Sequence, residues 1–167
     1  MKILVVGGTS GFGKDIAEHF NADAIGRKTG HNLPENLGAV VELTKNYNCI
    51  INCVSDSTQG LIASAMFDEH HRLNLNTYFI TVGSMTWRIE TPEQGKRQLF
   101  DWAESLITIK TTVKHTLLNP AWMYNTKEVG LFDSISKDDM LSLFEFLIKR
   151  FTLNSTISMI DIQGTPK

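Results

Sequence analysis

The segment VVGGTSGFGKDIAEHF, residues 5–20, limits the possible folds more than any other part of the sequence. It begins with an apolar run, passes through four glycines and continues with apolar residues at helical spacing: Phe12, Ile16, Ala17 and Phe20. A strand, a glycine turn and a helix in this order open a βαβ unit. The glycines let the backbone come very close to a neighbouring group, and the helix offers free N–H groups at its start.

Strands and helices alternate along the rest of the chain. We expect strands at 2–6, 23–27, 31–33, 48–54, 77–83, 111–118 and 155–162, and helices at 12–20, 34–46, 57–73, 92–107 and 138–151. This alternation predicts a single α/β domain over residues 1–167, with a doubly wound parallel sheet (a Rossmann fold). The sheet should have about seven strands in the order 3-2-1-4-5-6-7, with helices on both faces.

The segment 34–46 has two interpretations. Its core, GAVVELT, is typical of a strand, but such a strand would leave about five residues before the next one, too few for a parallel crossover. A helix beginning at Pro34 avoids this problem and places one set of side chains on a common face: Leu37, Val40, Val41 and Thr44. We therefore expect a helix at 34–46 and a short third strand at 31–33.

Composition excludes several classes of function. The 167 residues carry a net charge of −2, so no basic excess exists to bind nucleic acid. No apolar run reaches membrane-spanning length and no signal peptide is visible, which predicts a protein of the reducing cytoplasm. Cys49 and Cys53 lie in an apolar run without partner ligands, so we expect buried thiols and no metal site.

Two phosphate-binding motifs compete for the glycine turn. The phosphate loop GxxxxGK[ST] matches at Gly8, Gly13 and Lys14, but Asp15 stands where a hydroxyl should contact Mg²⁺, and its charge would repel phosphate. The alternative is GxxxGxG at Gly7, Gly11 and Gly13, in which the glycines allow a pyrophosphate to approach the helix start. A glycine-rich turn that binds nothing is a third possibility.

The end of the second strand favours the dinucleotide motif. An acidic residue there would bind a ribose 2′-hydroxyl, but the sequence has Arg27, Lys28 and Thr29. Two cations and a hydroxyl suit the 2′-phosphate of NADP. Judged alone, the same tripeptide is also consistent with a solvated basic turn.

Five segments together resemble the short-chain dehydrogenase/reductase family over nearly the whole chain. They are VGGTSGFG, INCV (51–54), ITVGS (80–84), LLNPAW (117–122) and MIDIQG (159–164). The resemblance implies NADP(H) as cofactor, held by Gly7, Thr9, Ser10, Gly11, Phe12, Gly13, Arg27, Lys28, Thr29, Asn32, Leu33, Asn52, Cys53, Val54, Pro120, Ala121 and Trp122.

The resemblance also supplies candidate catalytic residues. The family pairs a Ser with a Tyr-x-x-x-Lys motif, in which Lys lowers the Tyr pKa and the phenolate exchanges a proton with substrate. Ser84 and Lys96 stand at the matching positions, but Pro92 replaces the Tyr. Tyr124, which follows the NPAW segment, is a candidate replacement.

Three functions follow as alternatives. The first is an oxidoreductase that transfers hydride between NADPH and a small carbonyl or alcohol substrate. The second is a catalytically silent dinucleotide-binding sensor or regulator, which the missing Tyr favours. The third is a scaffold that serves only protein association. The family commonly forms dimers through the helices expected at 57–73 and 92–107, and Phe100 or Trp102 would then face the partner, because residues two apart point in different directions.

Overall fold

A computed structural model of the chain describes residues 1–54, 58–83, 99, 101–103, 111–120, 136–152 and 159–162. In this part of the chain, six strands form one sheet in the order β2-β1-β3-β4-β5-β6. The strands are β1 (Ile3–Val6), β2 (Asp23–Ile25), β3 (Cys49–Asn52), β4 (Tyr78–Val82), β5 (Lys114–Pro120) and β6 (Met159–Ile162). All neighbouring strands are parallel, which confirms the predicted doubly wound α/β fold.

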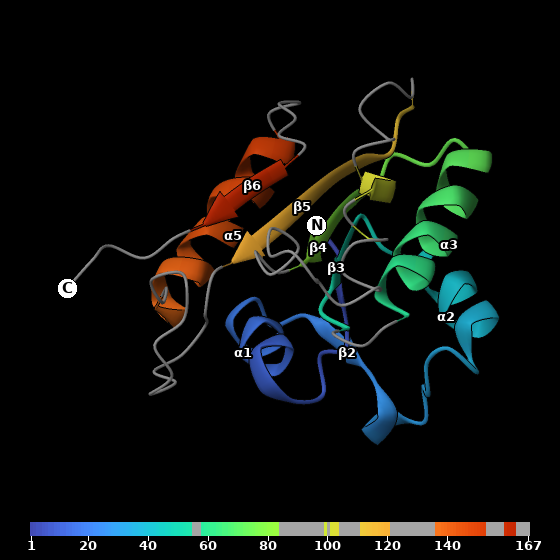
Figure 1. Cartoon of the computed structure of the whole chain (residues 1–167), viewed down its shortest axis with the longest axis horizontal. Coiled ribbons are helices and arrows are strands. Elements are labelled where there is room, and N and C mark those ends of the chain that lie inside the picture. The colour runs from blue at the N-terminus through green and yellow to red at the C-terminus, as the bar shows by residue number, and fades with distance from the viewer. Residues whose placement is uncertain are drawn as a thin grey trace.

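Helices cover both faces of the sheet (Figure 1). α1 (Gly11–His19) and α5 (Lys137–Thr152) lie on one face, and α2 (Leu37–Thr44) and α3 (Gln59–Arg72) lie on the other. Successive strand residues point to opposite faces, so the central strands, covered by helices on both sides, need apolar residues on both. Toward α1 and α5 the strands present Val5, Ile51 and Ile80, and toward α2 and α3 they present Leu4, Ile50 and Phe79, all fully or almost fully buried.

The two expectations for 31–46 have different outcomes. The helix is confirmed in its central part, since α2 spans Leu37–Thr44. The third strand at 31–33 is wrong, because these residues enter a turn instead. The Asn32 N–H donates to the side chain of Asn36 (2.8 Å), the Asn36 N–H donates to the Asn32 carbonyl (2.7 Å), and Pro34 has no N–H to offer a ladder. The other six strands follow the predicted order.

Two buried histidines join elements beneath the surface. His70 of α3 contacts Thr44 of α2 through Nε2 (2.9 Å) and Thr77, just before β4, through Nδ1 (2.8 Å). The Thr44 hydroxyl donates its proton to the Val41 carbonyl (2.6 Å), so it accepts from His70 Nε2–H and the neutral ring keeps its proton there. Burial lowers the pKa of His70 to about 4, chiefly because charge is costly in this apolar setting.

His115 of β5 is the second buried histidine. Its Nε2 lies 3.0 Å from the Thr81 hydroxyl of β4, and burial lowers its pKa to about 3. Its ring also packs against Trp102, with the centroids 4.9 Å apart. Both histidines are therefore neutral structural groups.

None of the described helices combines the length and the apolar composition that a membrane span needs.

Candidate functional site

The glycine turn after β1 is fixed by its neighbours on both sides. The N–H groups of Gly7 and Gly8 donate to the Ile25 carbonyl at the end of β2 (2.9 and 3.1 Å). On the other side, the Cys53 N–H donates to the Val6 carbonyl (2.8 Å). Gly7 has φ +80°, and a Cβ there would come within 3.0 Å of the Cys53 backbone. Only glycine fits this position without strain.

Gly13 and Gly11 have different roles. A Cβ on Gly13 would meet the Gly7 carbonyl oxygen and lie 3.1 Å from Cys53 Cβ, so Gly13 lets α1 pack directly on the turn. At Gly11, where φ is +53°, a Cβ would have no atom within 4 Å. The sequence predicted that both glycines make room for a ligand. The structure assigns Gly13 to packing and leaves open space only in front of Gly11, at the start of α1.

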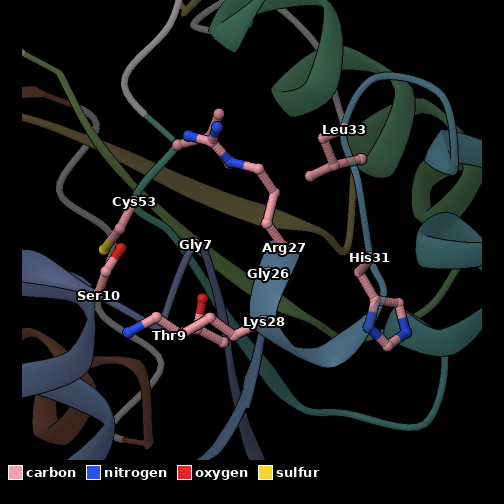
Figure 2. A pocket seen from close by; sticks show the side chains of 10 residues that line it. Gly7, Thr9, Ser10, Gly26, Arg27, Lys28, His31, Leu33 and Cys53 are labelled. Carbon is pink, nitrogen blue, oxygen red and sulfur yellow. The ribbon is translucent and has the colours of Figure 1, made fainter.

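A cavity of about 320 Å³ lies beside this turn, at the carboxyl ends of β1, β2 and β3. Its lining residues are Gly7, Thr9, Ser10, Gly26, Arg27, Lys28, His31, Leu33, Cys53 and Val54. In Figure 2, Ser10 and Cys53 lie on one side of Arg27, and Leu33 and His31 lie on the other. The chain runs from β1 outward to β2 and then returns to β3 on the opposite side of β1. Ligands of open α/β sheets bind at such a switch point.

The charged side chains among the described lining residues, Arg27 and Lys28, are both positive. Arg27 and Lys28 are both exposed and begin the short helix η1 (Arg27–Thr29) directly after β2. Among the residues that the structure describes, no carboxylate lines the cavity and no ion pair joins either cation to another residue. Two cations that no described carboxylate neutralises attract an anionic ligand to this cavity.

Thr29 has a structural task in the same turn. Its hydroxyl accepts the Gly26 N–H (3.0 Å) and lies 2.9 Å from the Gly26 carbonyl, to which it can donate. It also lies 3.1 Å from Nδ1 of His31. Thr29 does not line the cavity but orients the residues that do.

The structure brings together about half of the sequence-predicted cofactor residues. The ones that line the cavity are Gly7, Thr9, Ser10, Arg27, Lys28, Leu33, Cys53 and Val54. The described residues that do not line it are Gly11, Phe12, Gly13, Thr29, Asn32 and Asn52. Pro120 ends β5, and only its backbone is described. The remaining candidates lie outside the described residues: Ser84, Lys96, Ala121, Trp122 and Tyr124.

Phe12 and Asn52 are buried below the cavity. The Phe12 ring packs in the core against Phe144 of α5, with centroids 6.1 Å apart. Asn52 is fully buried, and its Oδ1 accepts the Val54 N–H (3.2 Å), which shapes the backbone that follows β3. Its Nδ2 has no hydrogen-bond partner among the residues that the structure describes. Asn52 therefore acts on the cavity through Val54, whereas Phe12 belongs to the core between α1 and α5.

Sequence reasoning missed two lining residues, Gly26 and His31. Gly26 directly precedes the cations Arg27 and Lys28, and a Cβ there would meet the Thr9 hydroxyl. The absence of any side chain at that position was the available signal. His31 lies in the turn that replaces the expected strand at 31–33, and no sequence motif marks it.

The Cys53 thiol adds no reactive group to the site. Burial raises its pKa to about 12, so the thiol stays protonated near neutral pH. Burial likewise raises the pKa of Cys49 in β3 to about 12. Both cysteines are free thiols, and the described residues contain no cluster of ligands able to hold a metal ion.

Comparison with known protein families and with the sequences of curated proteins gave no match. Comparison with solved structures gave many. A short chain dehydrogenase from Bacillus anthracis has a TM-score of 0.71 at 11% identity, over 98% of this chain and 95% of that one. A 4-hydroxyisoleucine dehydrogenase complexed with NADH has a TM-score of 0.68 at 12% identity, over 98% of both chains.

A third similar structure contains the phosphorylated cofactor. The dTDP-4-dehydrorhamnose reductase from Bacillus anthracis, in complex with NADP, has a TM-score of 0.65 at 10% identity, over 99% of this chain and 76% of that one. At such low identity these likenesses establish a shared fold. The chain has the doubly wound fold that these dehydrogenases and this reductase also have.

Proposed function

We propose that this chain binds NADP(H), with the adenosine half of the dinucleotide in the cavity beside the glycine turn. One observation carries the proposal: a cavity at the switch point of the sheet is bordered by Arg27 and Lys28, and none of the described residues that line it is acidic. A carboxylate would select the free 2′-hydroxyl of NAD, whereas two cations suit the 2′-phosphate that only NADP carries.

The described residues also suit the adenosine and the pyrophosphate of the dinucleotide. A cavity of about 320 Å³ falls within the size range of small-ligand sites and suits one nucleoside with its phosphate. Next to it, open space in front of Gly11 gives a pyrophosphate access to the first N–H groups of α1. Leu33 and Val54 supply apolar contacts for a base.

A direct titration tests the proposal. NADPH and NADH are added separately to the full chain, and binding is followed by calorimetry. We expect both to bind, with NADPH the tighter, since charge-assisted hydrogen bonds contribute roughly 1.5–3 kcal/mol each. Equal affinities would refute the NADP preference, and no binding of either dinucleotide would refute the site.

We further propose an oxidoreductase that acts on a small carbonyl or alcohol. The nicotinamide, when bound, supplies the hydride donor or acceptor. The resemblance assigns Ser84 to steady the substrate oxygen and Lys96 to hold the nicotinamide ribose, with Tyr124 as the candidate proton donor. A silent dinucleotide-binding protein is the second candidate, because Pro92 stands where the family has its Tyr.

Turnover separates these two candidates. NADPH oxidation is followed across a broad panel of aldehydes, ketones and quinones. An oxidoreductase should turn over at least one class at ordinary enzyme rates, roughly 1–1,000 per second. Tight NADPH binding without turnover of any panel member would replace the enzyme with the sensor or regulator.

A homodimer through α3 and the helical segment around 101–103 remains part of the proposal. Trp102 packs inward against Phe67, with the ring centroids 5.8 Å apart, so it is not the interface residue. Phe100, the alternative, lies outside the described residues. On α3, the Leu61 side chain is 57% exposed and available to a partner. Light scattering that shows only a monomer at high concentration would exclude the dimer.

A further inference from the structure

His31 is a further side chain of the cavity that can carry a positive charge. It lines the cavity together with Arg27 and Lys28, and it is partly exposed. It lies on the side of Arg27 opposite Cys53 (Figure 2). An anionic ligand held by the two permanent cations therefore lies in the same cavity as this histidine.

The backbone of the turn keeps His31 close to the end of β2. The Gly26 carbonyl accepts both the Thr29 N–H (2.9 Å) and the His31 N–H (3.1 Å). The carbonyl of Arg27, the next residue, accepts the Gly30 N–H (3.1 Å). Residues 26–31 thus form a closed turn, in which the chain comes back at His31 to the place where Arg27 begins.

Thr29 fixes the tautomer of the His31 ring. The Thr29 hydroxyl oxygen accepts the Gly26 N–H (3.0 Å), and it lies 2.9 Å from the Gly26 carbonyl oxygen and 3.1 Å from His31 Nδ1. A carbonyl oxygen can only accept, so the hydroxyl donates its proton to Gly26 and the ring donates from Nδ1–H. Within the described part of the chain, Nε2 has no hydrogen-bond partner and is the nitrogen available to a ligand.

This tautomer determines how the ring can meet a phosphate. Nε2 of the neutral ring presents a lone pair, which repels a phosphate oxygen, and it becomes a donor only when the ring takes up a second proton. Histidine is the side chain that commonly gains this proton between about pH 5 and 8. Arg27 and Lys28 oppose a further positive charge beside them, whereas the negative charge of a bound phosphate favours it.

The other titratable groups near the cavity do not replace the phosphate in this role. Cys53 lines the cavity, but burial raises its pKa to about 12, so the thiol stays neutral. Glu35, the acidic residue nearest to His31 along the chain, is exposed and does not line the cavity. Among the described residues, no ion pair joins His31 to a carboxylate.

We propose that His31 takes up a proton from solvent as NADPH binds and donates a hydrogen bond from Nε2 to the 2′-phosphate, beside Arg27 and Lys28. This role rests on the proposed function and adds to it a contact that NADH cannot make. It also couples the choice between the two cofactors to pH, because the contact exists only while the ring is charged.

A variant that cannot be charged tests this role. His31→Gln keeps a polar side chain, and calorimetry with the full chain compares its affinities with those of wild type at about pH 6 and at about pH 8.5. Near pH 6 the variant should bind NADPH about tenfold more weakly, close to the lower end for a charge-assisted hydrogen bond. Near pH 8.5 the difference should be at most about twofold, and NADH affinity should match wild type at both pH values. Variant and wild type are compared at each pH because the phosphate itself also gains a proton in acid.

His71→Gln is the matched control. His71 is exposed on α3 and contacts a threonine hydroxyl through Nδ1, as His31 does (2.9 Å to Thr111), but it does not line the cavity. This variant should bind both dinucleotides like wild type at both pH values.

The possible outcomes separate this role from the proposed function. If His31→Gln binds NADPH like wild type near pH 6, or is weakened by the same factor at both pH values, the inference is wrong, while tighter binding of NADPH than of NADH by wild type still supports the proposed function. An equal loss of NADH affinity would assign His31 to the shape of the turn and would also overturn the inference. If wild-type protein binds no dinucleotide, the proposed function fails, and the role of His31 fails with it.

Discussion

Thr9 lies so close to Gly26 that its hydroxyl oxygen occupies the space a Cβ at position 26 would need. The backbone of Gly26 is extended, with φ 169°, so any residue type could adopt it. The requirement for glycine here is therefore purely steric, and it is imposed by a residue of the glycine turn.

This contact predicts a reciprocal pair of variants. Gly26→Ala should destabilise the protein by about 1–3 kcal/mol, the usual cost of overpacking. Adding Thr9→Ala removes the atoms that clash, so the double variant should recover most of the loss. Chemical unfolding of the wild-type protein and of the two variants measures this. A double variant less stable than Gly26→Ala would show that Thr9 is not the obstacle.

Arg27→Ala should reduce NADPH affinity by roughly 10- to 150-fold, the equivalent of a charge-assisted hydrogen bond, while changing NADH affinity little. The reason is that only NADPH carries the 2′-phosphate. Arg150→Ala, on α5 where the guanidinium lies over the Phe146 ring, is the control for loss of an exposed arginine. A parallel loss of NADH affinity would mean that Arg27 contacts a part common to both cofactors.

Gly13→Ala should lower the free energy of unfolding by about 1–3 kcal/mol, because the new Cβ meets the Gly7 carbonyl and α1 must move off the turn. Gly38→Ala in α2 is the matched control, since a Cβ there has no atom within 4 Å. That change should stabilise the protein by about 0.5–1 kcal/mol. Similar effects from both substitutions would contradict the packing role of Gly13.

Acid should destabilise the protein in a window set by the buried histidines. The pKa of His70 falls from 6.5 to about 4 in the folded protein. Between these values the unfolded chain binds a proton that the folded protein does not, so stability decreases as pH falls from about 6.5 to about 4. The low pKa of His115, about 3, extends this window downward.

Urea unfolding across this pH range measures the effect. His70→Asn should reduce stability near neutral pH yet flatten the decline below pH 6.5. His71→Asn removes an exposed histidine from the same helix and should retain the steep decline. An unchanged slope in His70→Asn would exclude His70 as the source.

Glu69 affects stability at lower pH. Hydrogen bonds from Arg72 and then from Lys45 lower its pKa from 4.5 to about 2, so the stability that its ionised form contributes is lost only as pH falls below about 4.5.

The features that could be predicted from the sequence are those that depend on local patterns of residues. A parallel crossover needs a minimum length, and this requirement predicted the helix α2. The cations Arg27 and Lys28 indicated the edge of the sheet at which the cavity lies. The predictions for the strand at 31–33 and for Gly13 failed because they depend on contacts that sequence periodicity does not encode. The Asn36 side chain caps the backbone of Asn32 and converts an expected strand into a turn, and the role of Gly13 depends on where the Gly7 carbonyl points.

The turn at 31–36 leaves β2 at the border of the described sheet. A border strand exposes unpaired N–H and C=O groups, which invite strand addition from another molecule. β2 has only three residues, and the first, Asp23, is exposed and accepts a hydrogen bond from Tyr47 (2.9 Å). So short a strand, with a charge at its start, is a poor template for self-association. β2 is therefore ill suited to recruit a strand from another molecule, although no described strand covers it.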